Sequence, residues 1–185
     1  MKAKKKVIAI VGMPGSGKAL ASTVAVELGY PVYICGDVIR EEVERRGFPP
    51  TSENVGRVMF KVREEEGYGV VAKRLIPKIS SSSSRVVVVE GVRNIEEVNE
   101  LKKLYDVKIV AIQASPTVRF RRLVARGRSD DPRSWDDFQA REKREVKVGI
   151  GRVIDQADLV LVNEGTVEEL KTKFKDLLER FSQDG

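Results

Sequence analysis

The chain has 185 residues and an apolar fraction of 41%, which suit one folded α/β domain over 1–185 and exclude a chain disordered throughout. It contains no histidine and one cysteine, so an internal disulfide and a histidine general base or metal ligand are excluded. The net charge of +6 suits an anionic small molecule or nucleic acid as partner and does not separate the two.

The start of the chain, Met1–Lys6, is basic, but the apolar run that follows is too short for a signal peptide and leads into glycines. No apolar stretch approaches the roughly 20 residues that cross a bilayer. We therefore expect a cytoplasmic protein that does not associate with membranes.

Five runs of apolar, mostly β-branched residues predict strands. Most of the runs are continuous rather than alternating, which is typical of strands covered on both faces. The predicted strands are Val7–Val11, Pro31–Ile34, Val86–Val89, Val107–Ala111 and Leu159–Val162. Cys35 follows the second run, and we expect it to be a small buried side chain of that strand.

Helical patterns separate the strands, and capping signals at Ser115, Ser134 and Thr166 mark three helix starts. The strict alternation predicts an α/β fold of three layers, in which helices cover both faces of a five-stranded parallel sheet. The predicted helices are Lys18–Leu28, Val38–Arg46, 95–104, 117–125, a long polar helix at 134–154 and an amphipathic helix at 167–181.

Two segments interrupt this alternation. The first, at about 36–80, is mostly helical in pattern and ends in the serine run Ser80–Ser84, which we interpret as an exposed flexible connection. The second, at about 126–133, is a short charged loop. In a phosphotransferase such insertions hold the acceptor and form a lid, so we predict an acceptor-binding insertion and a short lid here.

The most specific motif is Gly12-Met-Pro-Gly-Ser-Gly-Lys18, which follows a buried strand and opens a helix. Its glycines allow backbone N–H groups to surround a phosphate, and the helix start adds partial positive charge. Lys18 can reach the β- and γ-phosphates of ATP. The predicted nucleotide-binding residues are Gly12, Met13, Pro14, Gly15, Ser16, Gly17, Lys18 and Ala19.

The position after Lys18 departs from this motif. It normally carries a serine or threonine that binds Mg²⁺, and here it is Ala19. Nucleotide binding through the backbone should survive, whereas metal placement is weakened. Ser22 lies one turn further along the helix, and we expect it to be too distant to replace the hydroxyl.

Arginines cluster near the expected strand ends and helix edges, where open α/β sheets bind ligands. Their planar forks suit phosphate groups. The segments are Gly36-Asp37-x-x-Arg40, Glu90-Gly-Val-Arg93, Arg122-x-x-x-Arg126 with Arg128, and later Arg141.

These segments resemble the nucleoside monophosphate kinases. Gly36-Asp37-x-x-Arg40 and Glu90-Gly-Val-Arg93 are similar to acceptor-side elements of adenylate kinase, with Arg93 one residue earlier than in that pattern. The last third resembles dephospho-coenzyme A kinase through its Ser-Pro helix start, its acidic lid and Ala157-Asp158 before Asn163. From Val7 to Leu178 the chain resembles an archaeal family related to adenylate kinase. The resemblance implies a P-loop NTPase fold of the NMP-kinase type that binds ATP and Mg²⁺.

The resemblance also implies roles. Lys18, Arg122, Arg126 and Arg128 would act on the transferring phosphoryl group, and Arg40 and Arg93 would hold the acceptor. Asn163 would line the adenine pocket, or else be a turn residue after a strand. Solvated helix faces for Arg122 and Arg126, and a surface ion pair for Arg93, are the alternatives.

Two carboxylates, Asp37 and Glu90, are expected at strand ends near the loop. Either could bind Mg²⁺ through water or contact the acceptor, and Asp37 could instead cap a helix. We infer an ATP-dependent kinase for a nucleoside monophosphate or a dephospho-CoA-like acceptor. The alternative is a nucleotide-dependent binding or assembly factor, RNA-associated and with weak ATPase activity, which Ala19 and the basic charge favour.

Overall fold

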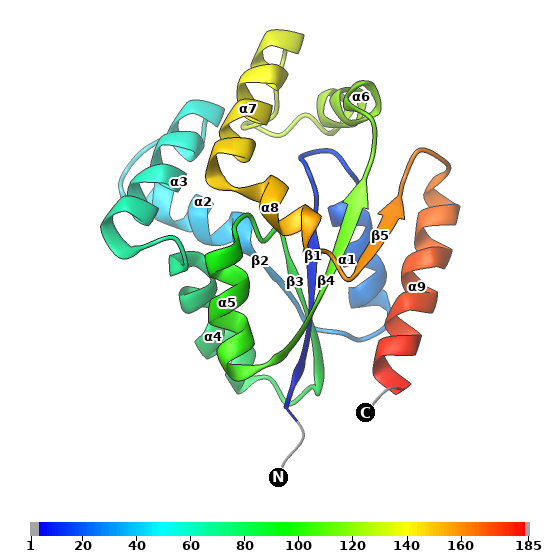
Figure 1. Cartoon of the computed structure of the whole chain (residues 1–185). Coiled ribbons are helices and arrows are strands. Elements are labelled where there is room, and N and C mark those ends of the chain that lie inside the picture. Colours follow the sequence, from blue (N-terminus) through cyan, green and yellow to red (C-terminus); the bar gives the residue numbers. More distant parts are fainter. Residues whose placement is uncertain (1–3, 184–185) are drawn as a thin grey trace.

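The computed structural model describes residues 4–183, so residues 1–3 of the basic start and residues 184–185 lie outside it. Its five strands form one parallel sheet in the order β2-β3-β1-β4-β5 (Figure 1). The strands are β1 (Lys6–Val11), β2 (Val32–Ile34), β3 (Val86–Glu90), β4 (Asp106–Gln113) and β5 (Leu159–Val162). All five predicted strands and the predicted fold class are therefore confirmed.

Helices lie on both faces of this sheet (Figure 1). None of the helices within residues 4–183 is long and apolar enough to cross a membrane. The helices are α1 (Lys18–Glu27), α2 (Cys35–Arg45), α3 (Ser52–Glu66), α4 (Val70–Ser81), α5 (Ile95–Leu104), α6 (Pro116–Arg126), α7 (Trp135–Val148), α8 (Ile150–Asp155) and α9 (Val167–Gln183).

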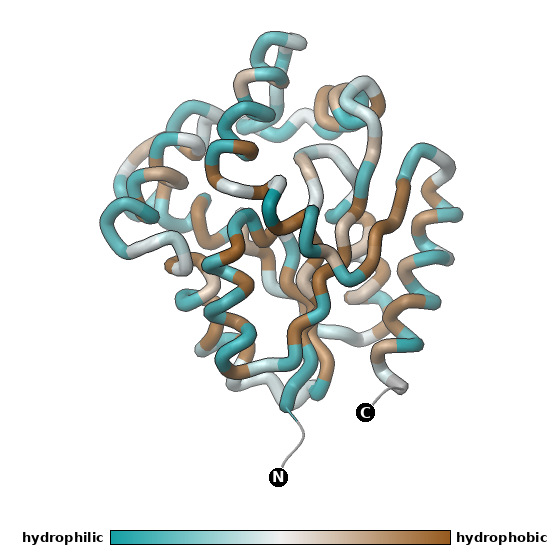
Figure 2. Tube along the Cα trace, viewed as in Figure 1, coloured by the Kyte–Doolittle hydropathy of each residue, from teal (hydrophilic) through white to brown (hydrophobic). Residues whose placement is uncertain are grey.

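The central strand β1 shows why the sheet is covered twice. Its successive side chains point to opposite faces, as strand geometry requires. Val7, Ala9 and Val11 join the larger core cluster with α2, α3, α4 and α5, whereas Ile8 and Ile10 join the smaller cluster with α1 and α9. Both sets are apolar, so the apolar run of β1 after Lys6 is continuous rather than alternating, and hydrophobic residues gather in the region of the central strands in Figure 2. The edge strand β5 is different, because three of its four residues are exposed.

Three local predictions are wrong. The polar helix expected at 134–154 ends at Val148, because Gly149 adopts a left-handed φ of 114° and α8 starts anew. The helix expected from Val38 begins at Cys35, after Ile34 in extended conformation, so Cys35 is buried in a helix rather than on a strand. Asp37 therefore lies in the first turn of α2 and is not its N-cap.

The serine run also differs from its prediction. Ser80 and Ser81 belong to the end of α4, and the Ser80 hydroxyl is 2.7 Å from the Tyr105 hydroxyl. The capping box that starts α7 at Ser134 is complete, since Ser134 accepts from the Asp137 backbone and Asp137 accepts from that of Ser134. Ser115 occupies the N-cap of α6, but its hydroxyl donates to Glu164 instead of capping the helix.

Candidate active site

The loop Gly12–Lys18 connects the carboxyl end of β1 to α1. Gly15 and Gly17 have φ angles of 80° and 115°, which side chains disfavour. The space is equally restrictive, since a Cβ at Gly15 would meet the backbone of Arg119 and one at Gly17 would meet Asn163. The glycine backbone angles and the close contacts with Arg119 and Asn163 therefore fix the loop conformation.

Lys18, the last residue of the loop motif, folds back over it. Its ammonium donates to the backbone oxygens of Gly12 at 2.7 Å and Met13 at 3.1 Å. Burial lowers the pKa of Lys18 to about 8, while Glu90 opposes this shift and Arg93 adds to it. An anion beside the ammonium would raise this pKa again and favour the charged form, so the residue is suited to a phosphate.

Two buried side chains support the loop from behind. The Asn163 amide donates to the Ser16 oxygen at 2.8 Å. The Arg119 guanidinium donates to the Pro14 oxygen at 3.3 Å and, through both terminal nitrogens, to Glu142 on α7 at 2.7 and 2.6 Å. Asn163 thus holds the loop, and its predicted contact with adenine stays a prediction.

Sequence reasoning missed Arg119. One signal was available: Arg119 precedes Leu123 by four residues and shares its inward face on α6, whereas Arg121 is exposed. A buried arginine needs a carboxylate partner, and Glu142 provides it. The pair links the loop to α7.

The space beside the loop, which we call the loop pocket, has a volume of about 150 Å³. The Nη1 atom of Arg122 is buried there without a hydrogen-bond partner among residues 4–183. Burial lowers the pKa of Arg122, and Glu164 opposes the shift. A ligand oxygen would supply the missing partner, and the predicted contact of Arg122 with phosphate stays a prediction. The loop pocket is lined by Gly15, Gly17, Lys18, Ala19, Glu90, Arg122, Leu123 and Arg126.

The residues around the loop pocket offer few ligand atoms for Mg²⁺. Residues 4–183 contain no group of three or more histidine, cysteine, aspartate or glutamate side chains that could hold a metal. Ala19 offers no ligand atom, and the Ser22 hydroxyl donates to Glu90 at 2.6 Å. Mg²⁺ often binds through one or two carboxylates together with substrate phosphates. Glu90 fits that pattern, so it would hold the ion together with the nucleotide.

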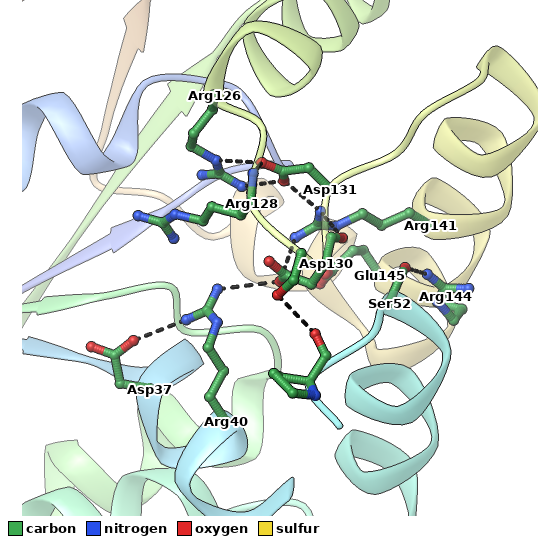
Figure 3. A network of polar contacts seen from close by, with 12 residues as sticks. Asp37, Arg40, Ser52, Arg126, Arg128, Asp130, Asp131, Arg141, Arg144 and Glu145 are labelled. Carbon is green, nitrogen blue, oxygen red and sulfur yellow. Dashed lines mark hydrogen bonds and ion pairs between the residues drawn. The ribbon is translucent and has the colours of Figure 1, made fainter. Parts of the chain in front are cut away.

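Two aspartates of the predicted lid hold arginines that we assigned to phosphates (Figure 3). Asp131 accepts from Arg126 at 2.9 and 2.6 Å and from Arg141 at 3.1 Å. Asp130 accepts from Arg40 at 3.3 Å. Burial by itself would raise the pKa of Asp131, but the hydrogen bonds from Arg126 and the Arg128 backbone outweigh it and lower the pKa. The Arg126 guanidinium is thus paired with the lid, while its side chain remains 30% exposed.

Arg40 also pairs with Asp37 at 2.9 Å, whose side chain is 55% exposed. Asp37 and Arg128 lie outside the loop pocket, in an adjoining groove of about 730 Å³ that we call the side groove. Ala19 and Glu90 line both spaces, so the two adjoin each other. Arg128 is exposed.

A third space, the arginine pocket, lies between α2, α3, α7 and the lid and has a volume of only about 20 Å³ while its ion pairs are closed. Arg93 donates to Glu145 at 2.7 Å inside it, so the ion pair given as the alternative for Arg93 exists but lies mostly away from the surface, with the side chains 18% and 5% exposed. Burial alone would lower the pKa of Arg93, but Glu145 outweighs it and raises the pKa. The arginine pocket is lined by Gly36, Ile39, Arg40, Ser52, Val55, Gly56, Met59, Arg93, Asp130, Arg141, Arg144 and Glu145.

The parallel sheet and the loop that follows β1 define the class, which is the P-loop kinase-like fold. Among solved structures, TT1252 from Thermus thermophilus has a TM-score of 0.65 at 23% identity, covering 96% of this chain and 98% of that one. A gluconokinase from Sinorhizobium meliloti has a TM-score of 0.57 at 16% identity, covering 99% and 97%. At these identities the likeness shows the fold alone.

Sequence comparisons give the family. Residues 11–139 match the family profile described as an AAA domain. The UPF0200 protein of Hyperthermus butylicus is 45% identical over 183 residues, covering 99% of this chain and 98% of that protein. The UPF0200 protein of Pyrococcus abyssi is 42% identical over 179 residues, covering 94% and 96%. The chain belongs to the UPF0200 family, and the expected archaeal relationship is confirmed.

Proposed function

We propose that this protein is a phosphotransferase that moves the γ-phosphate of ATP onto a small acceptor, a nucleoside monophosphate or a dephospho-CoA-like molecule. The observation that carries the proposal is the proximity of the two polar pockets. Arg40 and Asp130 line both the arginine pocket and the side groove, and Ala19 and Glu90 line both the side groove and the loop pocket. A donor phosphate at the loop and an acceptor in the arginine pocket would thus meet near Lys18 and Glu90.

Phosphoryl transfer needs positioning and charge neutralisation more than a histidine base. We assign the nucleotide phosphates to the backbone N–H groups of the loop and to Lys18 and Arg122. Glu90, which Ser22 orients, would accept a hydrogen bond from the acceptor hydroxyl. Bound Mg²⁺ would neutralise charge on the phosphate oxygens. Arg126 and Arg128 would join from the lid after Asp131 exchanges partners.

The fold comparisons support a small acceptor, because similar structures include proteins named shikimate kinase and gluconokinase. They do not identify the acceptor, since the similarity extends to the fold only. Arg40 and Arg93 both line the arginine pocket, which supports an acceptor with an anionic group.

The test is an incubation with γ-labelled ATP, Mg²⁺ and a panel of AMP, CMP, GMP, UMP, their deoxy forms and dephospho-CoA. We expect label on one class of acceptor. A Lys18→Met variant should lower the rate by roughly 100-fold, since it loses the cation at the transferring group. No transfer from the native chain, with ATP binding intact, would refute the proposal for this panel.

The second candidate is a nucleotide-dependent binding factor, possessing weak ATPase activity and acting on RNA. The missing hydroxyl at Ala19 and the net charge of +6 favour it. RNA affinity that arises from phosphate contacts falls steeply with salt. RNA binding at low salt that falls in this way, together with no label on any acceptor, would favour this candidate over the kinase.

A further inference from the structure

A fourth space, which we call the back pocket, is lined by those residues of the loop that do not line the loop pocket. Gly15, Gly17 and Lys18 line the loop pocket, whereas Met13 and Ser16 line the back pocket. The back pocket has a volume of about 370 Å³ and, within residues 4–183, shares no lining residue with the other three spaces. The loop therefore separates two spaces, and the proposed transfer uses only one of them.

The Ser16 hydroxyl lacks a partner in the back pocket. Ser16 is 0% exposed, and its Oγ has no hydrogen-bond partner among residues 4–183. Buried hydroxyls are usually paired, because an unpaired one costs free energy. Serine has three staggered rotamers, so rotation about one bond can turn this hydroxyl toward a bound molecule. A ligand in the back pocket would supply the missing partner.

Apolar side chains from four elements make up most of the lining. They are Met13 of the loop, Ile112 of β4, Ile154 of α8 and Val162 of β5. Val162 is 57% exposed, so a ligand here would cover apolar surface that water now contacts. Ligand pockets measure roughly 300–1,000 Å³, and the back pocket lies at the lower end of that range. It suits a small organic molecule.

The charged residues of the lining disfavour a phosphate. The cation of the lining is Arg119, and both of its terminal nitrogens already donate to Glu142, at 2.7 and 2.6 Å. Glu164, which also lines the back pocket, is exposed and carries a carboxylate. An anion would meet this carboxylate and an arginine that is already paired, so an uncharged ligand fits best.

The polar side chains of the lining favour a nucleobase. Gln113 offers an amide that both donates and accepts, and Ser16 offers its hydroxyl. Gln113 pairs with Val162 in the sheet register, so their side chains lie on the same face. A glutamine amide can pair with the edge of a base by two hydrogen bonds. A nucleobase combines such an edge with a flat apolar body, which matches the lining.

The loop backbone connects the back pocket to nucleotide binding. The Met13 oxygen accepts from the Lys18 ammonium at 3.1 Å, and the Ser16 oxygen accepts from the Asn163 amide at 2.8 Å. The two loop residues whose side chains line the back pocket therefore also contact the residues that hold the loop. A ligand that immobilises Met13 and Ser16 leaves less motion to be lost when ATP binds, which raises ATP affinity.

We propose that the back pocket binds an uncharged nucleobase or nucleoside, separate from ATP, and that this ligand raises the affinity of the loop for ATP. The inference rests on the assignment of ATP to the loop and not on any transfer reaction. Because coupling between two binding sites is reciprocal, ATP raises the affinity of this second ligand by the same factor.

The test titrates the whole chain calorimetrically with adenosine, guanosine, cytidine and uridine. Each nucleoside is measured without nucleotide and then with a saturating, non-hydrolysable ATP analogue and Mg²⁺. We expect one nucleoside to bind in both states, with roughly fivefold to tenfold higher affinity when the analogue is present. Ribose should bind much more weakly, since it lacks the base.

Two variants connect this binding to the back pocket. Ser16→Ala should weaken nucleoside binding roughly threefold to tenfold and leave the midpoint of thermal unfolding unchanged or higher, because it removes a hydroxyl that is unpaired in the free protein. A merely structural Ser16 would lower that midpoint instead. Val162→Phe should weaken binding further by filling the space. Val146→Phe is the matched control, at a 60% exposed valine of α7 that lines none of the four spaces.

Four results would overturn the inference. They are that no nucleoside binds, that the ATP analogue abolishes the binding and so assigns the back pocket to the base of ATP itself, that the analogue leaves the affinity unchanged, or that Ser16→Ala and Val162→Phe both bind as the native chain does. The proposed function fails separately. Coupled nucleoside binding without transfer of label would support this inference and refute the kinase for its panel. Transfer of label without nucleoside binding would refute this inference alone.

Discussion

The loop pocket and the arginine pocket, although adjacent, are built in different ways. The loop is defined by glycine φ angles, by steric contact and by two buried side chains that hold its backbone oxygens. The arginine pocket and the lid are defined by ion pairs between long side chains, in which Asp130 and Asp131 join Arg40, Arg126 and Arg141. The first arrangement is ready for a phosphate, whereas in the second a ligand has to compete with carboxylates.

This difference assigns separate tasks to the two sites. A preorganised loop binds without reorganising, which favours affinity. Ion pairs that exchange partners couple binding to a movement, which favours a site that closes only around the right acceptor. Substitutions in the loop should therefore damage binding and folding together, and substitutions in the lid should alter opening while ATP affinity is kept.

The largest effect is expected from Gly17→Ala. The new Cβ would be strained at a φ of 115° and would collide with the Asn163 amide, which would lose its bond to Ser16. We expect the free energy of unfolding to fall by about 3 kcal/mol, because backbone strain adds to an unpaired buried amide. ATP affinity, measured by calorimetry, should fall by roughly 100-fold, because the loop N–H groups lose their positions.

Gly151→Ala is the matched control. Gly151 lies in α8 with nothing within 4 Å of a built Cβ. Alanine there should keep or raise the free energy of unfolding by about 0.5–1 kcal/mol, as in other helix interiors. Equal ATP affinity for both variants would contradict the preorganised loop.

The lid prediction concerns Asp131→Asn. The Asp131 side chain is 2% exposed and joins Arg126 to Arg141, so its loss leaves Arg126 without a carboxylate partner and Arg141 with Asp130 alone. We expect about 2 kcal/mol less stability, with the usual cost of a broken buried pair reduced by the partial exposure of Arg126. Hydrogen exchange at 126–133 should accelerate. ATP affinity should not fall, since the loop contacts remain and Arg126, which lines the loop pocket, is released toward the phosphates.

The pKa shift of Asp131 gives a second measurement of the same pair. Its folded-state pKa is lowered, so its contribution to stability is present above the ordinary carboxyl range and is lost as pH falls through the lowered value. Asp131→Asn should flatten that part of the acid-unfolding profile. Asp136→Asn, in the exposed first turn of α7, is the control and should leave the profile nearly unchanged. An unchanged profile in Asp131→Asn would refute the role of the pair.

Much of the loop Gly12–Lys18 and of the strand and helix beside it could be predicted, because the residues that specify them are neighbours in sequence. A β-branched run followed by glycines and lysine is sufficient to predict strand, loop and helix. The strand ends were within two residues of the observed ones. The break at Gly149 was missed because the polar pattern continues across it, and only the positive φ reveals it.

The sequence predicted which arginines lie near the ligand, but it did not predict the carboxylates that pair with them. Arg40, Arg93 and Arg126 were expected near ligand, and each lines a polar pocket. Their partners Asp130, Glu145 and Asp131 were not predicted, because ion pairs between segments far apart in sequence leave no local pattern. Arg144 was missed for the same reason, since it is defined by a helix that packs 92 residues away in sequence.

The pH dependence of ATP binding should sharpen the description of the loop. Lys18 has a pKa of about 8 in the free protein, and phosphate favours its charged form. Affinity should therefore fall above pH 8, by up to about tenfold per pH unit until the raised pKa of the complex is reached. The stability of the free protein changes with pH in the opposite direction, since its free energy of unfolding rises between pH 8 and the ordinary pKa of lysine. Lys18→Met should bind ATP more weakly and lose this pH dependence. A native protein whose ATP affinity stays the same from pH 7 to pH 10 would contradict the prediction.

The smallest effect is expected from Ala19→Ser, which restores a hydroxyl next to the loop. Position 19 lines the loop pocket beside Glu90, so the serine would add a second Mg²⁺ ligand to a site that offers one carboxylate. We expect roughly a tenfold lower Mg²⁺ requirement for ATP binding, comparable with single-ligand changes elsewhere. Titration of Mg²⁺ at fixed ATP measures this without any transfer reaction, and Thr23→Ser, one turn along α1, is the control. An unchanged Mg²⁺ requirement would mean that Glu90 and the nucleotide already provide enough ligands for the ion, and that a hydroxyl at position 19 does not contribute to its binding.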